Sequence, residues 1–169
     1  KWMMEQPEGF FMIKQGISFH SSMKDSIPDF HYGVVQKKAG YHGAMDQGQI
    51  SERGFNHMLD CVAAMKEVLG DKVSLALDCG PGWFLNDAIR FARAVEKYHL
   101  MWLEDMLTGD YVPWVNPQAY RELTVSTTTP IHTGEQIYLR HNFKELIETQ
   151  AVRVIGPDPA DIGGIAELK

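Results

Sequence analysis

Val73-Ser74-Leu75-Ala76-Leu77-Asp78 is a short apolar run that ends at a carboxylate, and Cys-Gly-Pro-Gly follows it directly at 79–82. A buried parallel strand ends in this way when its last side chain faces a functional site, because glycine and proline then stop the strand. Two later stretches repeat the pattern, since 100–104 ends at Glu104 and 130–135 ends at Glu135. Helix-like segments lie between them, so the sequence predicts consecutive strand–helix units that build a parallel sheet.

The three terminal carboxylates are spaced by about one strand–helix unit each, with 26 residues from Asp78 to Glu104 and 31 from Glu104 to Glu135. In a (β/α)8 barrel the C-terminal ends of all strands meet at one face, where sites are built. Three bare anions that converge there repel one another and require a cation. Oxygen ligands with room for waters suit Mg²⁺, so we predict a Mg²⁺ site at this face.

Five stretches of the sequence resemble motifs of the enolase superfamily. Leu-Asp-Cys-Gly at 77–80, Leu-Glu-Asp-Met at 103–106 and Thr-Gly-Glu-Gln at 133–136 are similar to its metal-ligand triad. Gly-Pro-Asp-Pro-Ala-Asp-Ile-Gly-Gly at 156–164 resembles the sixth-strand motif of the mandelate racemase/muconate lactonizing enzyme branch, and 10–16 resembles the second strand of that branch. The resemblance implies an α/β fold, in which the chain forms about strands 2 to 6 of a TIM-type barrel.

The length of the chain bears on its domain organisation. A complete barrel takes about 250 residues, whereas this chain has 169. We therefore expect residues 1–169 to be a partial barrel domain from a longer enzyme, with an irregular insertion at about 17–49. A compact smaller domain in its own right is the alternative, and the insertion is interpreted either as a substrate lid or as an excursion at an oligomer contact.

Composition narrows the class of protein. A hydrophobic content of 44% supports a globular core, while a net charge of −6 argues against a general partner in nucleic acid or acidic membranes. No apolar run is long enough to cross a membrane. Two cysteines make no disulfide framework, so a reducing, cytoplasmic location is the simpler expectation. The expected partners are a small acid-sugar substrate and further copies of the same chain in a homo-oligomer.

Helical periodicity predicts the connecting elements. Apolar residues recur on one face over 51–69, where Ser51 can cap the helix and Gly70 can end it. Shorter helices are predicted over 86–98, 117–123 and 142–148, and a further helix begins at 163. The helix over 142–148 is expected to turn Phe143, Leu146 and Ile147 inward. Strands are predicted over 9–16 and 151–155 in addition to the three that end at carboxylates.

The resemblance also implies a mechanism. A base removes the proton α to a carboxylate, and Mg²⁺ stabilises the ene-diolate that forms. Asp158 matches the aspartate that orients a catalytic histidine, and that histidine is expected beyond Lys169. Lys14 matches the first lysine of a Lys-x-Lys motif, but Gly16 replaces the second and can supply no base.

A single base favours a sugar-acid dehydratase, a carbon–oxygen lyase, over a racemase or epimerase with bases on both faces. A non-catalytic metal-binding or assembly fragment is the alternative from another class. His132 and Trp114 are candidate substrate contacts, although a hydrogen-bonded barrel histidine and simple aromatic packing fit them equally well. Asp105 adjoins Glu104, and because neighbouring strand residues face opposite sides, both are not expected to bind metal in the same way.

Overall fold

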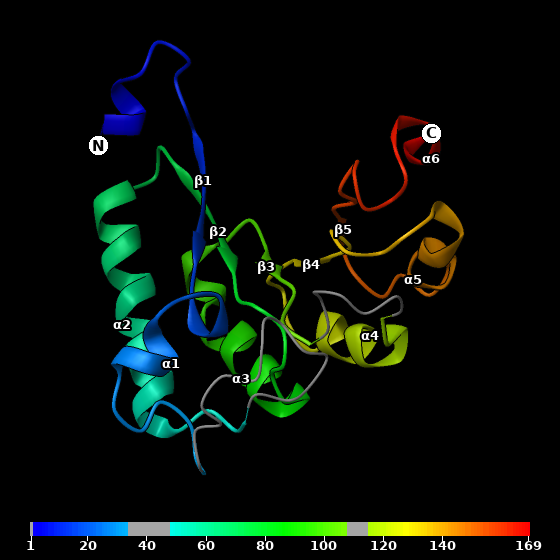
Figure 1. Cartoon of the computed structure of the whole chain (residues 1–169). Coiled ribbons are helices and arrows are strands. Elements are labelled where there is room, and N and C mark those ends of the chain that lie inside the picture. Colours follow the sequence, from blue (N-terminus) through cyan, green and yellow to red (C-terminus); the bar gives the residue numbers. More distant parts are fainter. Residues whose placement is uncertain (1, 34–47, 108–114) are drawn as a thin grey trace.

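Five strands form one parallel sheet in the computed structural model, which describes residues 2–33, 48–107 and 115–169. The strands are β1 (Met12–Gly16), β2 (Ser74–Asp78), β3 (Leu103–Glu104), β4 (Ile131–Thr133) and β5 (Val154–Ile155). Their spatial order equals their order in the chain, and every pair is parallel (Figure 1). The predicted parallel α/β architecture is therefore confirmed.

Helices alternate with the strands and follow the same order around the sheet (Figure 1). The α-helices are α1 (Met23–Ser26), α2 (Glu52–Leu69), α3 (Leu85–Ala94), α4 (Pro117–Val125), α5 (Lys144–Glu148) and α6 (Ile165–Leu168). The 3₁₀ turns are η1 (Trp2–Glu5), η2 (Ser18–His20), η3 (Glu96–Tyr98) and η4 (Arg140–Phe143). None of the helices in the described part of the chain combines the length and the apolar character that a membrane span requires.

The caps of α2 are those that the sequence predicts. The Ser51 hydroxyl accepts a hydrogen bond of 3.0 Å from the Gly54 backbone N–H, which satisfies one of the free donors in the first turn. Gly70 ends the helix with a φ of +64°, a conformation that costs glycine little. The apolar face buries Phe55, Met58 and Val62 against the sheet side of the molecule.

Several predicted elements differ in detail from the observed ones, and the strand predicted over 130–135 ends at Thr133 rather than at Glu135. The helix predicted over 86–98 ends as an α-helix at Ala94, and η3 follows it. The strand predicted over 100–104 pairs only at its last two residues. Leu146 is buried as expected, but Ile147, which was also expected to face inward, is 57% exposed, because α5 has only five residues and buries one narrow face.

The core of the molecule is rich in aromatic side chains. Trp83 packs on Phe91 and Phe19, with ring centroids 5.4 and 5.9 Å apart, and Phe91 meets Phe55 edge to face at 6.2 Å. Phe19 also meets Phe30 at 6.1 Å. This cluster joins α2 and α3 to the segment after β1, so it holds that segment at the C-terminal ends of β1 and β2.

The described parts of the predicted insertion are anchored at both ends. Ile17 donates its backbone N–H to the Asp78 carbonyl at 2.8 Å, immediately after β1. Further on, His31 and Ile50 form an antiparallel bridge, and the Ile50 N–H donates to Asp87 at 2.9 Å. Residues 34–47 lie outside the described residues. The boundaries of an insertion at 17–49, and the assignment of 1–169 to one partial barrel domain, stay predictions.

Candidate metal centre and active site

Four residues at the end of the sheet lie in one register row. Gly16 pairs with Asp78, Asp78 with Glu104, and Glu104 with His132. Residues in register on neighbouring strands point to the same side of a sheet. The row therefore places the side chains of Asp78, Glu104 and His132 next to one another, although 54 residues separate the first from the last in the sequence.

Glu104 lies at the centre of the row and is only 2% exposed. The Lys14 ammonium donates to Oε1 at 2.6 Å, and the Trp102 indole N–H donates to Oε2 at 2.8 Å. Lys14 Nζ also lies 3.1 Å from Asp78 Oδ2, so it bridges the two carboxylates. Burial disfavours a charged carboxylate unless it is paired, and here a cation and a neutral donor compensate the charge.

The two carboxylates stabilise the protonated, positively charged form of Lys14. Its partial burial acts to lower its pKa, but the hydrogen bond to Glu104 and the attraction of Asp78 outweigh this and raise the pKa above its ordinary value. A divalent cation that took Glu104 Oε1 or Asp78 Oδ2 as a ligand would compete with Lys14 for that oxygen.

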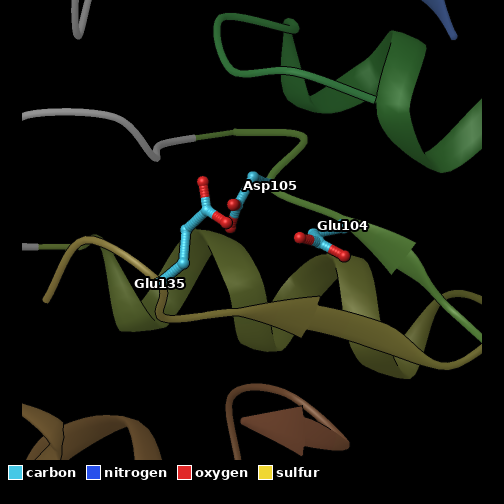
Figure 2. Close-up of side chains that lie close together, drawn as sticks. All are labelled: Glu104, Asp105 and Glu135. Carbon is cyan, nitrogen blue, oxygen red and sulfur yellow. The ribbon is translucent and has the colours of Figure 1, made fainter. Parts of the chain in front are cut away.

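Asp105 turns toward Glu104 rather than away from it, contrary to the prediction from strand alternation. Its φ is +52°, a left-handed conformation that ends the strand after Glu104. Figure 2 shows the carboxylates of Glu104, Asp105 and Glu135 gathered in the same region, the first two from the end of β3 and the third from the loop after β4. One oxygen from each of them lies within 4.8 Å of the others.

The chemistry of this group fits a hard divalent cation. Asp105 is buried, and its Oδ1 accepts a hydrogen bond of 2.6 Å from the Thr133 hydroxyl. Burial, reinforced by the nearby carboxylates of Glu135, Glu104 and Asp78, raises the pKa of Asp105 well above its ordinary value. A cation among these oxygens would relieve the repulsion that raises it.

A magnesium ion could be held by Glu104, Asp105 and Glu135. Asp78 is linked to Glu104 by Lys14, which contacts both carboxylates. In octahedral Mg²⁺ coordination, neighbouring ligand oxygens lie about 2.9 Å apart and opposite ones about 4.2 Å apart. The three oxygens, which lie within 4.8 Å of one another, would therefore have to move closer together to bind one ion. Glu135 reaches this group because β4 stops at Thr133 and Gly134, at a φ of +129°, redirects the chain. The ligand set Asp78, Glu104 and Glu135 stays a prediction, to which Asp105 is a possible addition.

His132 is buried beside Glu104. Its Nδ1 lies 3.7 Å from Glu104 Oε2 and has no hydrogen-bond partner among the described residues. Burial lowers the pKa of His132, and Lys14 adds to this effect while Glu104 opposes it. Burial thus favours the neutral form of the ring. Its predicted role as a substrate contact remains untested.

His20 occupies the space beside Gly16. A Cβ at Gly16 would lie 2.5 Å from the His20 carbonyl oxygen, so the backbone of η2 fits closely against this glycine. His20 Nδ1 lies 3.3 Å from Asp78 Oδ1, and the ring is half exposed. The face on which Gly16 provides no side chain thus carries an imidazole from the following turn, which the sequence analysis did not anticipate.

The predicted site residue Asp158 lies apart from this network. The Asp158 carboxylate is exposed, and its Oδ1 accepts hydrogen bonds from the Ala160 and Asp161 N–H groups at 2.6 and 3.2 Å. These bonds describe a local turn after β5, and the proposed contact with a histidine stays a prediction. Trp114 lies outside the described residues.

Trp102 and His20 are the site residues that sequence reasoning missed. Trp102 precedes Glu104 by two residues, so strand alternation could have placed the two side chains on the same side. The approach of His20 to Asp78 has no comparable signal, because it depends on how η2 folds back over the end of β2.

Comparison with known proteins agrees with the fold and with this set of motifs. The model of the family described as enolase C-terminal domain-like matches residues 31–169. The chain belongs to this family. The match covers most of the chain, and it confirms the resemblance to the enolase superfamily inferred from the strand-end motifs.

Relatives of this chain include named sugar-acid dehydratases. D-xylonate dehydratase from Haloferax volcanii is 37% identical over 114 residues, which cover 68% of this chain and 26% of the relative. L-talarate/galactarate dehydratase from Salmonella typhimurium is 30% identical over 105 residues, which cover 62% of this chain and 25% of the relative. The chain thus spans about a quarter of the length of these relatives.

A similar solved structure is that of a mandelate racemase/muconate lactonizing enzyme-like protein from Rubrobacter xylanophilus. It is 34% identical with a TM-score of 0.72, and the match covers 95% of this chain and 35% of that one. The Salmonella typhimurium L-talarate/galactarate dehydratase, solved with Mg and L-lyxarohydroxamate, is 26% identical with a TM-score of 0.61, over 72% of this chain and 30% of that chain. These neighbours are TIM-barrel proteins of the enolase superfamily, so the chain corresponds to part of a barrel.

Proposed function

We propose that this chain carries the metal-binding part of a Mg²⁺-dependent sugar-acid dehydratase. The observation that supports this most strongly is the gathering of Glu104, Asp105 and Glu135 after two adjacent parallel strands, with Lys14 bridging Glu104 to Asp78. Relatives named as dehydratases of xylonate and of talarate and galactarate suggest the class of substrate. The particular sugar acid is left to experiment.

The residues of this chain would act on the carboxylate end of the substrate. Asp78, Glu104 and Glu135, with Asp105 beside them, would hold Mg²⁺, which supplies positive charge to the substrate carboxylate as the ene-diolate forms. Lys14, once released from Glu104 and Asp78, would donate hydrogen bonds to the same carboxylate and hold it in place. These contacts stabilise the ene-diolate dianion more than they stabilise the bound substrate, which is a monoanion. This difference in stabilisation is what accelerates the reaction.

The rest of the reaction is a proton transfer followed by loss of water. A base takes the α-proton, the β-hydroxyl leaves as water after it accepts a proton, and the enol becomes a 2-keto-3-deoxy acid. Asp158 is proposed to orient that base, which is expected to be a histidine outside this chain. His132 and Trp114 are proposed to contact the remainder of the substrate.

The test is an assay of the intact protein against a panel of aldonic and aldaric acids, with the 2-keto-3-deoxy product measured in the presence and absence of Mg²⁺. We expect turnover of at least one sugar acid, and we expect it to cease when the divalent cation is chelated. Binding of Mg²⁺ without turnover of any sugar acid would favour the non-catalytic alternative.

An epimerase is the second candidate, and His20 is the observation that favours it. The imidazole lies on the side of the site where Gly16 provides no base, and it contacts Asp78. Two bases on opposite faces of the α-carbon would allow the proton to be removed from one face and returned to the other.

A further inference from the structure

Trp102 and Lys14 divide the two oxygens of Glu104 between them. The indole N–H donates to Oε2 at 2.8 Å, while the Lys14 ammonium donates to Oε1 at 2.6 Å. An indole has a single donor and no acceptor, and it carries no charge. A cation can therefore displace Lys14 from Oε1 by competition, whereas nothing in that exchange displaces Trp102 from Oε2.

The indole is held in place by a stack of rings. It lies on the imidazole of His132 with centroids 5.4 Å apart and an angle of 24° between the planes. The imidazole is buried and in register with Glu104. Behind it there is no free space, because a Cβ at Gly156 would collide with His132 Nε2. Gly156, His132 and Trp102 thus form a continuous packed path to the carboxylate.

We infer that Trp102 is a positioning residue that fixes Glu104 Oε2 and so presents Oε1 to the divalent cation. The inference rests on the proposed function, since it assumes that Glu104 is a metal ligand. Its physical reason is that a glutamate has several rotatable bonds, and a ligand that is already held in one orientation loses less freedom on binding. A partner of this kind typically changes metal affinity by about 10- to 100-fold when it is removed.

The variant Trp102→Phe tests the inference, because it removes the N–H donor and keeps an aromatic ring on His132. Mg²⁺ affinity is measured by calorimetry on the full-length protein without substrate, and we expect Kd to rise about 10-fold or more. Turnover at saturating Mg²⁺ should change less than the Mg²⁺ concentration that gives half-maximal turnover. A general loss of structure would not produce that separation.

Trp83→Phe is the matched control. The Trp83 indole also donates one hydrogen bond, to the Cys79 carbonyl at 3.3 Å, but it contacts no carboxylate of the site among the described residues. We expect this variant to lose stability and keep its Mg²⁺ affinity. Equal Mg²⁺ affinity in Trp102→Phe and the parent, within a factor of two, would overturn the inference.

A second variant decides the matter if Trp102→Phe does not fold. Gly156→Ala removes no side chain of the site, but its Cβ pushes on the His132 ring and, through that ring, on Trp102. Weaker Mg²⁺ binding by this variant supports the inference, and unchanged binding overturns it. Failure of the proposed function would give a different result in the same binding measurements. The parent protein would then bind no Mg²⁺, or Glu104→Gln would bind it as well as the parent does.

Discussion

Glu104 shows how one buried side chain links the stability of this protein to its proposed chemistry. The protein interior tolerates its charge because Lys14 and Trp102 satisfy both oxygens. The same arrangement leaves the carboxylate ready for a divalent cation, since Lys14 is half exposed and free to withdraw toward solvent. Affinity for the metal should therefore depend on the negative charge of Glu104 more than on its shape.

Glu104→Gln is expected to abolish most Mg²⁺ binding, since an amide keeps the shape of the side chain and removes its charge. Calorimetry on the intact protein measures this, and the expected loss is at least 10-fold in affinity. Glu122→Gln, a matched change at an exposed position on α4, should bind Mg²⁺ as the parent does. Unchanged binding by Glu104→Gln would remove this residue from the metal site.

At the scale of elements, short connections hold the strand ends in register. Glu96 in η3 is one such connection, because its Oε1 accepts hydrogen bonds from the Thr127 hydroxyl and the Thr128 N–H, at 2.8 and 2.7 Å, just before β4. These two donors, the backbone N–H above all, lower the pKa of Glu96 below its ordinary value of 4.5. Glu96 therefore fastens the end of α3 to the start of the strand that carries His132.

Glu96→Gln is expected to lower stability at pH 7 and to have less effect in acid. A carboxyl whose pKa is depressed by folding contributes stability above its unfolded pKa, and this contribution disappears as the pH falls through the folded pKa. The difference in urea midpoint between the variant and the parent should thus shrink from pH 7 to about pH 3. A difference that stays constant with pH would show that the charge of Glu96 does not matter, and Glu122→Gln supplies the comparison for a surface glutamate.

Asp158, in the turn after β5, has a structural role, because it accepts hydrogen bonds within its own loop. Its second, proposed role is to orient the catalytic base. Asp158→Asn separates the two roles of this residue, since the amide oxygen can still accept from Ala160 and Asp161 while the charge is lost. We expect α-proton exchange of a substrate to slow by roughly 10²- to 10⁴-fold, as for loss of effective general-base catalysis. Mg²⁺ binding should survive, and exchange at the rate of the parent would leave Asp158 with a purely structural role.

At the scale of the whole molecule, the two candidate functions differ in whether a base lies on one face or on both faces of the substrate's α-carbon. The proposed dehydratase needs only one, and Gly16 leaves the face at the end of β1 without a base from the strand itself. His20 reaches that face from η2 and touches Asp78, so the fold supplies a group that the strand does not. The two candidate functions make different predictions for this group.

We expect α-proton exchange in D₂O from only one C2 epimer of a sugar acid that the intact protein turns over. Exchange is followed by NMR with each epimer in separate samples. Comparable exchange from both epimers, with one of them lost in His20→Gln, would contradict the dehydratase and establish the epimerase. Exchange from a single epimer in both the parent and His20→Gln would exclude His20 as a second base.

Much of the fold could be predicted from local sequence, because hydrophobic periodicity and strand-end punctuation act over a few residues. The five strands, their parallel direction and the caps of α2 at Ser51 and Gly70 follow from such signals. Ile147 was misassigned because periodicity assumes a helix long enough to show one face to the core, and α5 is too short. The carboxylates Asp78 and Glu104 could be predicted to lie near each other because both end predicted parallel strands, and the structure then pairs them in register.

The sequence alone determined the strand–helix alternation, the family and the carboxylates that end β2 and β3, but not the end of β4, which stops at Thr133 before Glu135. Only the tertiary structure decided which groups meet: Lys14 between Asp78 and Glu104, Asp105 turned toward Glu135, Trp102 on Glu104, and His20 in the space beside Gly16. The physical reason is that periodicity reports which side of an element is buried, whereas a contact between residues 90 positions apart depends on register, on a left-handed residue such as Asp105 and on the path of a connecting turn.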